Sequence, residues 1–197
     1  MTGHRLSRLA LISLTVVLSF SCATSSDAPI DDDASMRSTA DSTATSTTML
    51  MHDADIAGIV LTANQGEVDL GQLARSMATS PEVRRFAEMI VTGHLEAIQK
   101  HQAIVARTGM RTTETPLRTQ LRNAGVATAD ALRQRSGSDF DGAYIRTQID
   151  MHQWLLDALE KSLIPASKNS ALRSHLNEVR DAVSMHLTEA RKIESSM

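Results

Sequence analysis

The sequence has few aromatic residues and a single cysteine. Phe, Trp and Tyr make up only 3% of its 197 residues, so the bulky side chains that favour strands are scarce. Alanine, leucine, methionine and straight-chain charged residues are plentiful instead, and these side chains lose little freedom on a helix. The 42% hydrophobic content suffices for the core of one domain. The composition therefore predicts one all-α domain, without an internal disulfide.

Several functional signatures are also absent. No Lys/Arg-rich tract with interleaved aromatic residues occurs, and the net charge is −3, so nucleic acid is not expected as a partner. The chain has no Gly-rich phosphate loop, no nucleophile elbow and no Cys–His pair. These absences exclude the commonest motifs of phosphate binding and nucleophilic catalysis.

The N-terminus resembles an export signal. Two arginines precede the apolar run LALISLTVVLSF (9–20), and Ser21-Cys22-Ala23 follows it. The run is too short to span about 30 Å of hydrocarbon as a permanent helix. We predict that residues 1–21 form a lipoprotein-like signal peptide and that Cys22 is lipidated. Ordinary cleavage after Ala23 is the alternative.

Residues 23–50 are rich in Ser, Thr, Asp and Ala and contain few large apolar side chains. Such a segment buries too little surface to offset its ordering entropy, so we predict a disordered tether. A lipid anchor would make the membrane a partner and place the protein on the periplasmic side of the outer membrane. Without lipidation the protein is expected to be periplasmic or secreted.

Stop signals divide the remainder into helices. The separators are Thr79-Ser80-Pro81, Gly109, Ser136-Gly137 and Pro165, with Ser138-Asp139 and Asn169 or Ser170 as expected caps. We predict a four-helix bundle over 53–195, with an extra helix in a long crossover. The expected helices cover 53–78, 81–108, 116–135 (the extra helix), 140–163 and 170–195.

Each long helix has an apolar stripe that one polar residue interrupts. These residues are Glu67, His94, His152 and His186. If helix 140–163 runs beside helix 81–108, all four lie about 10–12 residues from the same end, or about 15–18 Å along the axis. One carboxylate and three imidazoles are therefore expected to meet in a single layer of the core.

Two interpretations of this layer stay open. Three neutral imidazoles and a carboxylate form a ligand set suited to Zn²⁺, Cu²⁺ or another first-row transition metal ion. Alternatively the layer is structural, and Glu67 accepts hydrogen bonds from the imidazoles in a non-catalytic protein that acts through its surface. His101 follows His94 by two turns and is either a neighbour of the ligands or a polar residue near the helix end.

Enzyme chemistry fits this layer poorly. A ferritin-type di-iron site needs Glu-x-x-His on two helices, whereas Val91, Ile149 and Val183 stand three residues before the histidines. A closed four-ligand site also leaves no evident position for a substrate. Asp139 and Asp141 are better explained as caps of helix 140–163 than as a site.

Four phrases together resemble the bacterial domain-of-unknown-function family 4142. They are NQGEVDLGQLA (64–74), SPEVRRFAEMIVTGH (80–94), SDFDGAYIRTQIDMH (138–152) and the LTEA that follows His186. The resemblance covers about 53–193 and implies a ferritin-like helical bundle and export, because members are often labelled outer-membrane proteins. It supplies no established activity.

The family pattern has glutamate at position 67 and histidine at 94, 152 and 186, which are the positions that interrupt the stripes. Gly93 and Met151 stand where an acidic residue commonly precedes the histidine. Those acids could orient the histidines or serve as further ligands, so their absence bears on the expected metal affinity.

Overall fold

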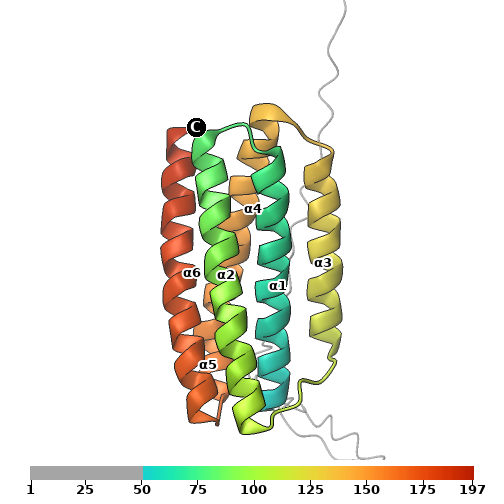
Figure 1. Cartoon of the computed structure of the whole chain (residues 1–197), viewed down its shortest axis with the longest axis vertical. Helices are drawn as coiled ribbons and strands as arrows, with labels where there is room; N and C mark the ends of the chain where they lie inside the picture. Colours follow the sequence, from blue (N-terminus) through green and yellow to red (C-terminus); the bar gives the residue numbers. More distant parts are fainter. Residues whose placement is uncertain (1–50) are drawn as a thin grey trace, which may run out of the picture. The chain divides into compact units, whose positions relative to one another are not determined.

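A computed structural model describes residues 51–197, and within that range the chain is helical and has no strand (Figure 1). The predicted signal peptide, the lipidation site Cys22 and the predicted tether over 23–50 lie outside the described residues. In chain order the elements are α1 (Asp53–Met77), α2 (Pro81–Thr108), α3 (Pro116–Arg133), α4 (Gly137–Ala158), the π-helical turn η1 (Leu159–Leu163), α5 (Ile164–Ala166) and α6 (Ser170–Ser196).

The four long helices pack around a shared core. α1 packs against α2, α2 against α6, α6 against α4 and α4 against α1. α3 carries the chain back along the outside of α1, so α4 runs in the same direction as α2 (Figure 1). α4 therefore lies mainly against α6 and α1, across the core from α2, and does not run beside it as expected. None of the described helices is long and apolar enough to cross a membrane.

Several predicted helix ends are confirmed. The Ser80 hydroxyl accepts hydrogen bonds from the backbone N–H groups of Glu82 and Val83, at 3.2 and 3.4 Å, at the start of α2. Asn169 caps α6 by accepting from the N–H of Leu172 at 3.0 Å. Gly109 ends α2 with a φ of 67°, which a residue without a Cβ adopts at little cost.

The boundaries of α4 differ from the prediction. α4 begins at Gly137, so Ser138 and Asp139 lie inside it. At its other end Pro165 does not end the helical path at Leu163, because η1 and α5 extend it to Ala166. The wider π turn shifts the hydrogen-bond register, and Pro165 then lies in the first turn of α5, where a missing N–H is tolerated.

At each end of the core an aspartate side chain accepts hydrogen bonds from a neighbouring loop. Asp141 accepts hydrogen bonds from Thr79 N (3.0 Å), Thr79 Oγ1 (2.6 Å) and Ser80 N (2.8 Å). Asp141 therefore holds the α1–α2 loop and does not cap its own helix as predicted. Asp53 accepts hydrogen bonds at the opposite end, at 2.9–3.0 Å, from the loop 167–169.

The apolar core consists of two clusters at different heights along the helices. The loop-side cluster lies near the α1–α2 loop and includes Leu70, Phe86, Ile90, Phe140, Tyr144, Ala190 and Ile193. The far cluster includes Ile56, Val60, Leu155, Leu159, Leu172, Leu176, Val179 and Val183. The polar stripe residues fall between these two sets along every long helix, so the core is divided by a polar layer.

Replacement of Asp141 tests the fastening of the α1–α2 loop. Asp141→Ala removes a buried carboxylate that accepts hydrogen bonds from three donors of the loop, so the free energy of unfolding should fall by about 2–3 kcal/mol. Urea denaturation followed by circular dichroism measures the change. Asp130→Ala removes only an exposed ion pair with Arg133 and should change stability by less than about 0.5 kcal/mol. Equal effects of the two substitutions would contradict the assignment.

Candidate metal centre

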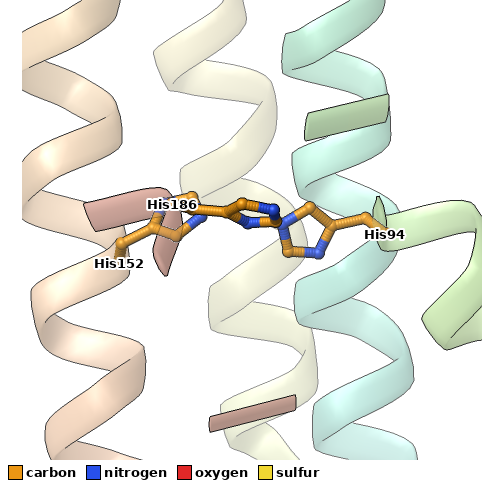
Figure 2. Close-up of side chains that lie close together, drawn as sticks. All are labelled: His94, His152 and His186. Atoms are coloured by element: carbon orange, nitrogen blue, oxygen red, sulfur yellow. The ribbon is translucent and has the colours of Figure 1, made fainter. Parts of the chain in front are cut away.

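Three histidines from three different helices meet between the two apolar clusters. His94 comes from α2, His152 from α4 and His186 from α6 (Figure 2). The ring centroids lie 5.7 Å apart for His94–His152, 5.2 Å for His94–His186 and 5.4 Å for His152–His186. Each ring offers one nitrogen within 4.8 Å of the nitrogens of the other two. The three rings thus form a nearly equilateral group, which we call the histidine triad.

Hydrogen bonds fix the protonation of two of the rings. His94 Nδ1 lies 2.8 Å from Asn64 Oδ1, and the Asn64 amide is oriented because its Nδ2 donates to the Val60 carbonyl. His152 Nδ1 lies 2.9 Å from the Gln148 carbonyl oxygen. Both partners can only accept, so each Nδ1 carries the proton and each Nε2 keeps its lone pair. This pattern of an oriented ring with a free second nitrogen is typical of histidines that bind metals.

The triad presents neutral nitrogens without partners. His94 Nε2, His152 Nε2 and His186 Nδ1 are buried and make no hydrogen bond. Burial, with the neighbouring rings, lowers the pKa of His94 well below its usual value. Burial likewise lowers the pKa values of His152 and His186 to about 4. All three rings are therefore neutral near pH 7, which is the state that a metal ion requires.

Glu67 lies beside the triad and outside it. Its Oε2 accepts a hydrogen bond from Gln148 Nε2 at 2.9 Å, and its Oε1 lies 3.7 Å from His152 Nδ1. The carboxylate thus approaches the side of His152 that already carries a proton, and it does not belong to the group whose ligand atoms lie within 4.8 Å of one another. The structure brings together three of the four predicted ligands, and the ligand role of all four stays a prediction.

Gly93 makes room for one ring of the triad. A Cβ at this position would lie 3.2 Å from both Cε1 and Nε2 of His186, which is closer than ordinary van der Waals contact. Any side chain larger than hydrogen at position 93, an acidic one included, would therefore have to displace the His186 ring. Gly93 allows α2 and α6 to approach closely at the level of the triad.

His101 does not contact the triad. Its ring lies 5.5 Å from that of His175, and both residues are buried in the far half of the core. Sequence reasoning missed His175. The usable signal was its spacing from His186, since residues eleven apart lie about three turns apart on nearly the same helix face.

The geometry provides three potential nitrogen ligands, and a four-coordinate ion would need one more ligand. A water molecule, or the Glu67 carboxylate after a side-chain rotation, could supply that ligand. A surface groove of about 840 Å³ lies between α1 and α3 and is lined by residues such as Asp69, Arg118 and Arg122. No histidine lines this groove, so it does not lead to the triad.

The stability of the metal-free protein should depend on Glu67 in a defined pH range. Burial raises the pKa of Glu67 from 4.5 to about 7, although the Gln148 hydrogen bond lowers it. Between these values the folded state holds a proton that the unfolded state releases, so this residue stabilises the folded protein less as the pH rises. Glu67→Gln removes that dependence.

The stability of Glu67→Gln relative to the unchanged protein should therefore rise between pH 5 and pH 8, by about 2–3 kcal/mol. Urea unfolding in the presence of EDTA measures it at each pH. A constant difference in stability between the two proteins across this range would show that the Glu67 carboxyl has the same pKa in the folded and unfolded states.

Comparison with known proteins places the chain by sequence. No curated protein and no solved structure matches it. The profile of one family, described as a domain of unknown function, matches residues 38–193, a range that contains every residue of the triad, Glu67 and the His101–His175 pair. The chain belongs to the domain-of-unknown-function family DUF4142.

Proposed function

We propose that this chain is an exported cell-envelope protein whose ferritin-like helical core binds one first-row transition metal ion through His94, His152 and His186. One observation carries the proposal. Three neutral ring nitrogens from three helices lie within 4.8 Å of one another, and one nitrogen of each ring is buried without a hydrogen-bond partner. The long connection from α2 to α4 through α3 supports the ferritin-like arrangement of the helices.

Metal binding is favourable because three ring nitrogens of the triad have no hydrogen-bond partner. Each buried polar atom without a hydrogen bond destabilises the fold by about 1–3 kcal/mol. A metal ion accepts three lone pairs at once and thereby offsets this loss. Two of the ligand rings are already oriented by Asn64 and the Gln148 carbonyl, so little side-chain entropy remains to be lost on binding.

The ligands favour some ions over others. Imidazole nitrogens suit Zn²⁺ and Cu²⁺, whereas Mg²⁺ and Ca²⁺ require oxygen ligands. Tetrahedral bonds of about 2.0 Å place neighbouring nitrogens about 3.3 Å apart. The ring nitrogens, which now lie within 4.8 Å of one another, must therefore move inward when the ion binds. Glu67 then acts most simply as a group that positions His152.

The alternative is a structural layer in a non-catalytic envelope protein that acts through its surface. The hydrogen bonds His94–Asn64 and Gln148–Glu67 favour it, since they satisfy part of the layer without an ion. The three remaining ring nitrogens favour the metal. A catalytic role has less support, because the triad lies between two apolar clusters and the described groove does not reach it.

Metal content tests the proposal directly. The purified chain should bind one equivalent of Zn²⁺ after treatment with EDTA and reloading, and saturation at 100 times the Kd should raise the free energy of unfolding by about 2.7 kcal/mol. His186→Ala removes one ligand and should abolish this equivalent while the helical content is retained. Elemental analysis and thermal unfolding followed by circular dichroism provide the measurements.

His52→Ala serves as the matched control, because His52 is exposed at the start of α1 and has no role in the triad. Zinc binding should be unchanged in this variant. Equal zinc content in His186→Ala and the unchanged protein would favour the structural interpretation, as would a protein that binds no ion at all.

The envelope location rests on the sequence that precedes the described residues. If Cys22 carries a lipid, Cys22→Ser should transfer the protein from the membrane fraction to the soluble fraction and abolish labelling by palmitate. Mass spectrometry of the mature N-terminus distinguishes the two processing routes. An unmodified N-terminus at Thr24 would show cleavage after Ala23 and overturn the lipid anchor.

A further inference from the structure

A pair of buried histidines lies away from the triad. His101 of α2 and His175 of α6 are 1% and 2% exposed, and their ring centroids lie 5.5 Å apart with planes inclined by 52°. Two turns separate His101 from His94 on α2, which corresponds to about 10 Å. The pair therefore cannot share an ion with the triad, and what it binds does not depend on the proposed function.

None of the four ring nitrogens of this pair makes a hydrogen bond. Burial, followed by the proximity of His175, lowers the pKa of His101 to about 4, although an interaction with the Ala57 backbone opposes this shift. Burial also lowers the pKa of His175, which Glu178 opposes and Lys100 reinforces. Both rings are thus neutral near pH 7, and each has a free lone pair. Two leucines would fill this part of the core without leaving four polar atoms unsatisfied.

The surroundings of the pair contain few other ligands. The far cluster has apolar members on both helices, Ala97 and Val105 on α2 and Leu172, Leu176 and Val179 on α6. The carboxylate of Glu178 raises the pKa of His175, but its side chain is 56% exposed and forms an ion pair with Lys100 at 3.3 Å. A divalent first-row ion prefers four or more ligands, whereas this pair supplies two ring nitrogens.

We propose that His101 and His175 form a second site, which binds a monovalent d¹⁰ ion, cuprous copper, between two imidazole nitrogens. Ions of this electron configuration accept two nitrogen ligands in a nearly linear arrangement. Two imidazoles bound in this way have ring centroids about 6 Å apart, or less when the arrangement bends. The observed separation of 5.5 Å falls within this range. A single positive charge is also the least costly to bury.

An ion pair between Lys100 and Glu178 lies at the surface, next in sequence to the pair. Lys100 precedes His101, Glu178 lies one turn after His175, and their side chains bridge α2 and α6. Both side chains are more than half exposed, so their contact is weak and opens readily. A cation that reaches Glu178 is then only one helical turn away from the buried rings.

Silver ions provide a redox-inert probe of this site. The purified full chain is titrated with silver nitrate in chloride-free buffer by isothermal calorimetry. The double variant His101→Leu/His175→Leu should bind one equivalent less than the unchanged protein, because it lacks both lone pairs. It should keep its zinc equivalent, since the triad is intact. Equal silver stoichiometry in the double variant and the unchanged protein would overturn the second site.

The converse variant separates this proposal from the triad. His94→Leu/His152→Leu/His186→Leu should lose zinc and keep the silver equivalent at the pair. If circular dichroism shows that this variant is unfolded, the single variant His175→Leu decides, because it should lose one silver equivalent and keep zinc. His52→Leu, at an exposed position, should change neither value. Loss of the silver equivalent in the folded triple variant would overturn the assignment to His101 and His175.

X-ray absorption identifies the coordination with cuprous copper itself. The triple variant is loaded without oxygen, in the presence of a reductant and by competition with bicinchoninate. The spectrum should show two nitrogen ligands at about 1.9 Å. Three or four ligands, or no uptake against the chelator, would contradict a two-coordinate site.

Discussion

Transfer of an imidazole from water into a protein core disfavours its charged form. This penalty determines the protonation of the buried histidines of this protein. Within residues 51–197 five histidine rings are at most 3% exposed, and the pKa of each is lowered by burial before any other cause. Neutral rings have free lone pairs, and most of these lone pairs have no partner. These lone pairs without partners are the observation on which both proposed ion sites rest.

The polar layer also sets the register of the helices. Apolar clusters lie on both sides of it, so a slip of one turn would move a ring about 5.4 Å into apolar surroundings.

The carboxylate of Asp141 at the end of the core and that of Glu67 inside it have different environments. Asp141 accepts three hydrogen bonds from the α1–α2 loop, whereas Glu67 accepts one from Gln148 and its pKa rises to about 7 because of burial.

Much of the fold follows from local signals. The caps Ser80 and Asn169 and the terminator Gly109 act within a few residues of their own positions, and they define helix ends as predicted. The interrupted stripes predict four residues at one height, and the structure brings three of them together, His94, His152 and His186. The predicted end of helix 140–163 was wrong. The π turn at 159–163 depends on how the chain packs, and local sequence signals do not determine this.

The sequence by itself determined where the helices lie and which faces are buried, because helix propensity, capping and apolar spacing act over a few turns. Tertiary structure decided the partners. The side chain of Asp141 accepts hydrogen bonds from a loop about sixty residues earlier. His101 pairs with His175 of another helix. Glu67 lies on the Nδ1 side of His152. Each of these contacts depends on the rotation and separation of whole helices, and a shift of a few ångströms decides whether a side chain binds, positions a neighbour or only packs.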